Sequence, residues 1–346
     1  MSDYTAETAA CLQTLQTWYN WQTGLWNTMG WWNAANALET IIDYSSLNGT
    51  QQYYPVIANC FNKLKSTNFI RPWYDDEGWW ALTWVKAYDL TNIADYLTMA
   101  QAIFDDIANG WDDSTCNGGV WWQKPNHYKS AIANELFFML AARLYLRTTT
   151  ATYLQWVQKA AQWFLGCGLI NAQTLINDGL GGNCQNNGQT TWTYNQGVIL
   201  GALVDSFKCA STSTGGSLLG TDGSDYLARA QSIADAAITQ LVDQQGILAE
   251  PCEAHGNCDG NQSLFKGIFM RNLAYLYQTL NENASATGMY DHYQQFIVKN
   301  ADSLWANNRT SDYKFGLRWS GPVDSADASR QTSALHCFNA ATPFSD

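Results

Sequence analysis

Apolar residues recur at the spacing of helix turns along most of the chain, while the alternation typical of half-buried strands is almost absent. This pattern predicts an all-α protein with twelve helices of ordinary length for a globular protein. We expect the helices at residues 5–22, 33–45, 51–65, 76–90, 92–109, 128–147, 151–167, 191–209, 223–241, 262–281, 288–307 and 327–341.

The predicted connections alternate between two kinds. Short ones, such as LTNI (90–93) and RTTT (147–150), alternate with long ones rich in Gly, Asn and Trp, such as RPWYDDEGWW before the fourth helix. Twelve helices joined in this way form six hairpins that can close into an (α/α)6 barrel. All the long loops would then lie at one end, at the N-termini of six inner helices. The alternative is an irregular helical bundle whose loops merely vary in length.

The chain contains no charge run or low-complexity tract of the length of a linker. The nearest candidate is STSTGGSLLGTDGSD (211–225), which we expect to be an exposed loop between the eighth and ninth helices. We therefore expect a single domain over residues 1–346.

Aromatic residues are unusually frequent, with 17 Trp, 18 Tyr and 13 Phe among 346 residues. Part of this set belongs to the core, but so many Trp residues suggest that some line a surface or a cleft. Sugar rings are a natural partner, because their apolar C–H faces stack on flat aromatic rings.

The net charge of −12 argues against a nucleic-acid partner or an anionic membrane surface, since phosphate binding needs clustered Lys and Arg and the chain has 18 scattered ones. No apolar run reaches the roughly 18 residues that a bilayer span requires. The four His residues are not spaced as metal ligands, and there is no CxxC pair. We expect neither a metal ion nor a cofactor.

Nine cysteines in a Lys-poor chain favour secretion and several disulfides. Cys252 and Cys258 are close enough to close one loop, and the odd number leaves at least one thiol unpaired within the chain. Four N-x-S/T sequons agree with a eukaryotic secretory route: Asn48, Asn261, Asn283 and Asn308. MSDYTAET lacks the features of a signal peptide, so we take the sequence as a mature form with an added Met, and no hydrophobic tail for a lipid anchor follows. We expect a secreted monomer.

Two adjacent acids, Asp75 and Asp76, stand at the predicted start of the fourth helix among aromatic residues. One explanation is helix capping, because Asp is a favoured N-cap and first-turn acids complement the helix dipole. A single Asp satisfies that role, however, and a second Asp followed by Glu77 adds repulsion. The surrounding rings would restrict water and raise the cost of placing like charges together.

Glycoside hydrolysis uses such a pair, because it needs one ionised and one protonated carboxyl group. Retaining enzymes hold the two groups about 5–5.5 Å apart and inverting enzymes about 6.5–9.5 Å. Side chains on neighbouring Cα atoms, about 3.8 Å apart, reach the shorter separation easily. The sequence therefore favours retention with a covalent intermediate, without assigning the two roles.

The stretch YDDEGWWALTWVKAYDLT (74–91) resembles glycoside hydrolase family 76, the α-1,6-mannanases, in its fungal secreted form. Further matching blocks follow in the family's order: GGVWWQ (118–123), YKSAIANELFFMLAARLY (128–145), WTYNQGVILGAL (192–203), the Cys252–Cys258 loop with FKGIFMR (265–271), and RWSG (318–321). The resemblance implies an (α/α)6 barrel and an endo-acting, retaining activity on α-1,6-linked mannan. It also implies that Asp75 is the nucleophile and Asp76 the general acid/base.

Aromatic and amide residues in the long loops are candidate substrate contacts, since sugar hydroxyls need both donors and acceptors. Each has a structural alternative, such as core packing for the Trp residues, capping for Asn195, or a solvated surface position for Lys266. The candidates are Trp32, Tyr74, Trp79, Trp121, Trp122, His127, Tyr128, Tyr194, Asn195, Gln196, Phe265, Lys266 and Trp319.

The leading hypothesis is a secreted endo-α-1,6-mannanase that cleaves the backbone of fungal or yeast mannan. The resemblance leaves open a cell-wall transglycosidase that acts on α-1,6-mannose-containing glycans with the same acids. A non-catalytic mannan-binding protein would keep the aromatic residues without needing both acids. A helical cyclase that holds magnesium lacks support, because there is no second acidic cluster of the usual kind.

Overall fold

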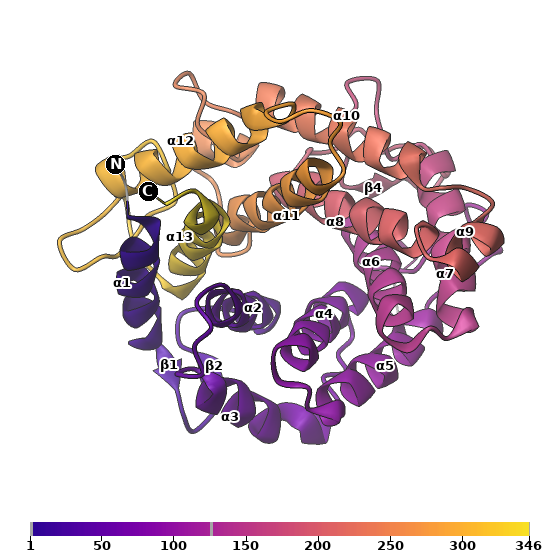
Figure 1. Ribbon diagram of the computed structural model, residues 1–346, viewed down its shortest axis with the longest axis horizontal. Coiled ribbons are helices and arrows are strands. Elements are labelled where there is room, and N and C mark those ends of the chain that lie inside the picture. Colours follow the sequence, from indigo (N-terminus) through magenta and orange to yellow (C-terminus); the bar gives the residue numbers. More distant parts are fainter. Residues whose placement is uncertain (1–2, 125–126, 346) are drawn as a thin grey trace. The chain divides into compact units, whose positions relative to one another are not determined.

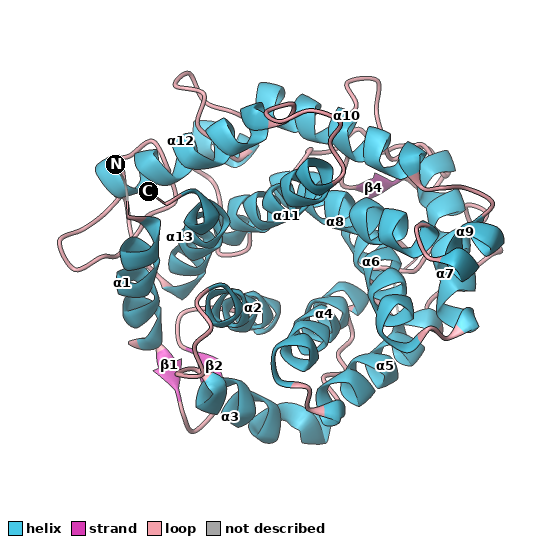
Figure 2. Cartoon of the chain, in the orientation of Figure 1, coloured by secondary structure: helices cyan, strands magenta, loops and turns pink. Residues whose placement is uncertain are grey.

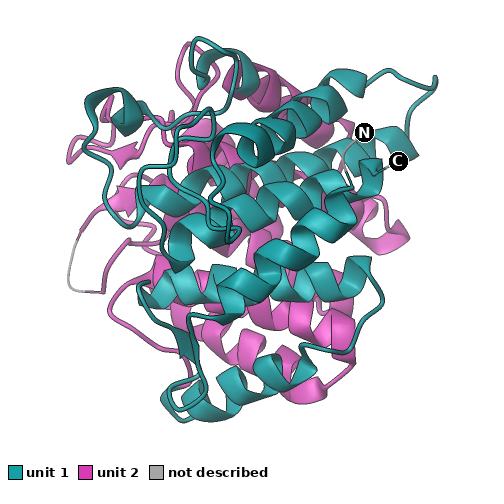
Figure 3. Ribbon diagram, turned by 90° about the vertical axis from the view of Figure 1, so that its left-hand side faces the viewer, with its two compact units in different colours: residues 1–67, 238–346 teal, residues 68–237 magenta. Residues whose placement is uncertain are grey.

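The computed structural model describes residues 3–124 and 127–345. These residues are mainly helical (Figures 1 and 2). Contacts divide the chain into two compact units, residues 1–67 with 238–346 and residues 68–237 (Figure 3). No helix in the described part of the chain combines the length and the apolar character needed to cross a membrane.

The first unit, residues 1–67 with 238–346, is built around one buried helix. Its helices are α1 (Tyr4–Gln16), α2 (Trp31–Leu47), α3 (Tyr54–Leu64), α11 (Gln262–Glu282), α12 (Asp291–Asn307) and α13 (Ala328–Ala341), with 3-10 helices η1 (Lys65–Thr67), η2 (Pro251–His255) and η3 (Thr342–Phe344). Helix α13 packs against α1, α2, α11 and α12, and nearly all of its side chains are buried. A Cβ atom at Gly267 would lie 2.6 Å from Cα of Ser333, so α11 and α13 can approach this closely because position 267 has no side chain.

The second unit, residues 68–237, has two layers of helices. The helices are α4 (Tyr74–Thr91), α5 (Ala94–Ala108), α6 (Ala131–Thr148), α7 (Ala151–Gly166), α8 (Thr193–Ala210), α9 (Ser213–Leu219) and most of α10 (Ser224–Gln240). Helices α4, α6 and α8 lie side by side, and α5 and α7 cover α4 and α6 (Figure 1). Because α4, α6 and α8 have neighbours on several sides, they are buried almost all round rather than along one stripe.

Two small antiparallel sheets fix the loops. Strands β1 (Tyr19–Asn20) and β2 (Leu25–Trp26) form a hairpin in the first unit. Strands β3 (Lys129–Ser130) and β4 (Gly179–Leu180) join the loops before α6 and α8 in the second unit, with Lys129 opposite Leu180.

The twelve helices expected from the sequence are all present, with two corrections. The first was predicted to run to residue 22, but α1 ends at Gln16 because Tyr19 leaves the helix to pack on Trp21 and Trp26, at ring-centroid distances of 5.1 and 4.7 Å. The stretch 211–225, predicted as a loop, contains α9, which is capped by Thr212 and ends at Gly220 in the left-handed conformation (φ 67°). Seven residues with two glycines are too short to show a periodic pattern.

The structure contains two disulfides, Cys116–Cys184 and Cys252–Cys258. The second confirms the predicted loop closure, and the first holds the turn around Cys116. The five remaining thiols are free in this structure: Cys11, Cys60, Cys209 and Cys337 are buried, and Cys167 is partly exposed. Single-domain organisation stays a prediction.

Candidate active site

Asp75 and Asp76 lie in the first turn of α4, but neither caps it. The N-cap residue is Trp73, which has extended backbone angles and makes no side-chain capping hydrogen bond. Neither acid is therefore the N-cap, although both lie in the first turn, where acids complement the helix dipole.

The loop before α6 fixes Asp75. The indole Nε1 of Trp122 donates a hydrogen bond of 2.9 Å to Oδ2 of Asp75. Main-chain bonds hold Trp122 in turn, since Tyr74 N donates to Trp122 O (3.0 Å) and Trp122 N donates to Tyr128 O (2.8 Å). The other oxygen of Asp75, Oδ1, is buried and accepts no hydrogen bond from any residue that the structure describes. One oxygen is thus anchored, and the other is buried without a hydrogen-bond partner among the described residues.

The surroundings raise the pKa of both carboxyl groups towards neutral pH. Burial raises the pKa of Asp75 to about 6, against the opposing effects of the Trp122 hydrogen bond and of the N–H groups of Asp76 and Asp75 itself. Burial and the charge of Asp75 raise the pKa of Asp76 to about 7, with Arg71 acting in the other direction. The pair therefore retains a proton at weakly acidic pH, and Asp76 is the more protonated partner.

Glu77, the third acid of the DDE sequence, has a different role. It is fully buried and accepts hydrogen bonds from the backbone N of Arg71 (2.8 Å) and from Nζ of Lys124 (2.7 Å). Lys124 also contacts Asp106 at 2.7 Å. Glu77 fastens the segment before α4 and is not part of the acid pair.

A third carboxyl group near the pair, Asp178, was missed by sequence analysis. It directly precedes β4 and accepts a hydrogen bond of 2.5 Å from the Tyr128 hydroxyl, which itself accepts one of 3.0 Å from Asn187. The charge of Asp178 contributes to the raised pKa of both Asp75 and Tyr194. The signal available in the sequence was NDGLGGN (177–183), a polar Gly-rich loop like those that carry the other candidates.

Two buried polar groups lie near the starts of the neighbouring helices. Glu135 of α6 and Asn195 of α8 are both 0% exposed, and neither side chain has a hydrogen-bond partner among the described residues. Burial, with a further contribution from Asp178, raises the pKa of Glu135 well above its ordinary value. The cap of α8 is Trp192, so Asn195 does not cap the helix.

Several other predicted contacts in the second unit are core residues. Tyr74 lies against Gly110, where an added Cβ would be 2.5 Å from the ring. Trp79 is 2% exposed, and its ring is 6.5 Å from that of Tyr194. The amide of Gln196 exchanges hydrogen bonds with N and O of Ile176 and so holds the loop before α8. Contact of these residues with a ligand stays a prediction.

The aromatic cluster in the loop before α6 is more open. Trp121 is partly exposed, with Nζ of Lys129 3.8 Å from its ring centroid and the ring of His127 4.9 Å away. His127 is exposed.

Four predicted contacts lie in the first unit. Trp32 donates to Oδ1 of Asn261 (3.0 Å), and its ring is 6.0 Å from that of Phe265. Lys266 is fully buried, with Nζ 2.5 Å from Glu253 and 2.7 Å from O of Leu317. Trp319, which is 1% exposed, lies beneath it at 4.9 Å. Lys266 thus holds a carboxylate in place inside the protein. Among the described residues, no group of three or more His, Cys, Asp or Glu could hold a metal ion.

Solved structures share the fold. The α-1,6-mannanase GH76A of Salegentibacter sp. HEL1_6 aligns with a TM-score of 0.85 at 21% identity, covering 99% of this chain and 100% of that one. Dfg5 from Chaetomium thermophilum, solved with glucosamine, aligns with a TM-score of 0.81 at 20% identity, covering 99% and 91%. The chain therefore has the all-α (α/α)6 fold expected from its sequence.

Curated fungal proteins are similar in sequence. Mannan endo-1,6-alpha-mannosidase DCW1 of Eremothecium gossypii is 27% identical over 286 residues, or 73% of this chain. The DFG5 protein of the same description from Saccharomyces cerevisiae is 26% identical over 314 residues, or 84% of this chain. The matches span 59% and 65% of these two relatives. The model of glycosyl hydrolase family 76 matches residues 3–343, and the chain therefore belongs to this family.

Proposed function

We propose that the protein is a secreted endo-α-1,6-mannanase that hydrolyses the α-1,6-linked mannose backbone of fungal mannan with retention of configuration. The observation that carries the proposal is the acid pair itself. Asp75 and Asp76 are adjacent, neither is used as a helix cap, and both have a raised pKa. Family membership and the activity named for the fungal relatives support the same substrate class.

The surroundings of Asp75 and Asp76 suggest which acid is the nucleophile and which is the general acid/base. The Trp122 hydrogen bond stabilises the anion of Asp75, which suits the nucleophile that attacks the anomeric carbon. Asp76 has the higher pKa and retains the proton that the leaving glycosidic oxygen requires. Water then releases the glycosyl-enzyme, with Asp76 acting as the base.

A relative supports this reading of the pair. An inactive variant of the Salegentibacter mannanase, in which two consecutive aspartates are replaced, has been solved with a bound α-1,6-mannotetraose; it aligns with a TM-score of 0.84. In that protein the loss of two neighbouring carboxyl groups is compatible with substrate binding.

Product analysis on linear α-1,6-mannan tests the proposal. We expect internal cleavage, and proton NMR should show that the α anomer is the first product formed. In Asp76→Asn, kcat should fall about 10²–10⁴-fold. Asp95→Asn, an exposed acid on α5, is the matched control and should leave kcat unchanged. A β anomer released first would refute retention. Longer products at high oligosaccharide concentration would indicate a transglycosidase, and binding without cleavage would indicate a mannan-binding protein.

Secretion is a separate part of the proposal. The two disulfides and the exposed sequon Asn283 support it. Asn308 is 0% exposed and its side chain is bonded to Gly316, so it is a poor glycosylation site in the folded protein. Expression behind a fungal secretion signal tests this part: we expect folded protein in the medium with glycan at Asn283, and a chain that fails to fold in the oxidising secretory pathway would contradict it.

A further inference from the structure

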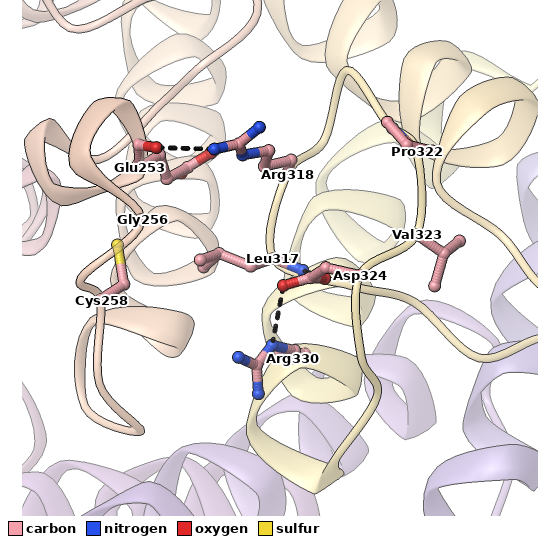
Figure 4. Close-up of a pocket in the computed structure, with 9 residues that line it drawn as sticks. All are labelled: Glu253, Gly256, Cys258, Leu317, Arg318, Pro322, Val323, Asp324 and Arg330. Carbon is pink, nitrogen blue, oxygen red and sulfur yellow. Dashed lines mark hydrogen bonds and ion pairs between the residues drawn. The ribbon is translucent and has the colours of Figure 1, made fainter.

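A pocket of about 360 Å³ lies entirely within the first unit, between the Cys252–Cys258 loop and the segment that leads into α13 (Figure 4). This volume is at the lower end of the range for small-molecule sites, about 300–1,000 Å³. It is lined by Arg318, Asp324, Arg330, Glu253, Leu317 and Val323, among others. Apart from Glu253 and Leu317, which contact Lys266, these residues have no role in the site described above.

Arg318 presents unused donors to this pocket. It is exposed, and its Nη2 donates 2.9 Å to the main-chain oxygen of Glu253. No carboxylate of the described residues lies within ion-pair distance of its guanidinium group. The free N–H groups form a planar fork that suits two neighbouring oxygen acceptors.

A carboxylate acceptor lines the same pocket. Asp324 stands between Arg318 and Arg330 in Figure 4, with Oδ1 accepting from N of Leu317 (2.8 Å) and Oδ2 4.0 Å from Nε of Arg330. That Nε is buried and has no hydrogen-bond partner among the described residues. The pocket is therefore lined by both donors and a carboxylate acceptor.

The charges of the pocket cancel. The formal charges of Arg318 and Arg330 equal those of Asp324 and Asp327, although only Arg330 is within ion-pair distance of these acids. The charge of Glu253 is balanced by Lys266. A site without excess positive charge disfavours an anion and suits a neutral ligand whose hydroxyl groups both donate and accept.

The walls are held in place before any ligand arrives. Lys266 joins Glu253 on one side to Leu317 on the other, and Glu253 also closes a capping box with Glu250 at the start of η2. The disulfide closes the same loop. Preorganised donors lower the ordering cost of binding.

We propose that this pocket is a subsite for one neutral mannosyl residue, whose vicinal hydroxyl groups accept from Arg318 and donate to Asp324. The proposal rests on the proposed function for the identity of the sugar. Each residue of an α-1,6-linked chain leaves its 2- and 3-hydroxyl groups unsubstituted, so a guanidinium fork and a carboxylate can engage adjacent oxygens.

Methyl NMR on the full chain tests the subsite directly. In an Asp75→Asn, Asp76→Asn background, α-1,6-mannotriose should shift the Val323 methyl signals saturably, and inorganic phosphate should not. Arg318→Ala should raise the dissociation constant read at Val323 at least tenfold. Arg318→Lys should behave similarly, because it keeps the charge but loses the fork. Arg229→Ala, an exposed arginine in the second unit, is the control.

Three outcomes would overturn the proposal: silent Val323 signals, unchanged affinity in Arg318→Ala, or a response to phosphate instead of the sugar. Circular dichroism checks that the variants are folded. The two proposals fail independently. Cleavage of mannan by the wild type with silent Val323 signals rejects the subsite alone, whereas a Val323 response without cleavage rejects the mannanase activity alone.

Discussion

The hydrogen bond from Trp122 to Asp75 offers a direct test of how the site is tuned. Trp122→Phe keeps an aromatic ring and removes the indole N–H that lies 2.9 Å from Oδ2. A hydrogen bond to a charged group is worth about 1.5–3 kcal/mol. Because one pKa unit corresponds to about 1.36 kcal/mol, the pKa of Asp75 should rise by about 1–2 units.

The consequence for activity follows from the direction of the shift. The proposed nucleophile must be ionised, so activity rises with pH through the pKa of Asp75, now about 6. In the variant the acid limb of the pH–activity profile moves to higher pH, and kcat/KM at pH 5 should fall about 10- to 100-fold. The maximum should fall too, because the pKa of Asp75 then reaches or passes that of Asp76, about 7.

The assay is the pH dependence of kcat/KM on an α-1,6-mannan oligosaccharide between pH 4 and 9. The control is Trp121→Phe, which changes the neighbouring indole and leaves the bond to Asp75 intact. An acid limb that stays in place in Trp122→Phe, or an equal displacement in Trp121→Phe, would refute the reasoning.

Three further predictions concern the supporting structure. Glu135→Gln removes a buried acid whose pKa is raised in the folded protein. The stability contributed by its protonated form is present below the unfolded pKa near 4.5 and is lost as pH rises, by at most about 1.36 kcal/mol per pH unit. The variant should therefore gain stability over the wild type as pH rises from 5 to 8, measured by urea unfolding, and a constant difference would contradict the burial argument. A Cβ at Gly179 would lie 2.3 Å from the Tyr128 hydroxyl, so Gly179→Ala should lower kcat about 10- to 100-fold, while Gly182→Ala, with no atom within 4 Å, should not. Cys116→Ser opens a disulfide that spans 68 residues and should cost about 4 kcal/mol of unfolding free energy, measured in guanidinium; an unchanged midpoint would contradict the loop-closure argument.

The sequence was most informative where one local pattern repeats. Helical periodicity located twelve helices because apolar residues recur at the spacing of helix turns even in α4, α6 and α8, which are buried almost all round. The two adjacent acids stood out because a helix start needs one cap at most. The identity of the cap was not predictable, since Trp73 takes that position through backbone geometry that no side-chain preference signals.

Contacts between residues far apart in the chain could not be predicted from the sequence, because they depend on how the loops meet in the folded protein. Asp178 contributes to the site through its contact with Tyr128, fifty residues away along the chain. The pairing of Cys116 with Cys184 likewise depends on how two loops meet. The burial of Trp79 and Lys266 likewise follows from tertiary packing and could not be predicted from residue type, and their contact with a ligand stays a prediction.

The disulfide between Cys116 and Cys184 connects two loops with distinct effects on one carboxylate. The first loop supplies the indole that anchors Asp75, and the second supplies the nearby charge of Asp178. A reducing agent that opens this one bond should therefore weaken both influences on Asp75 together, so that the titration of that carboxyl group depends on the redox state of two loops.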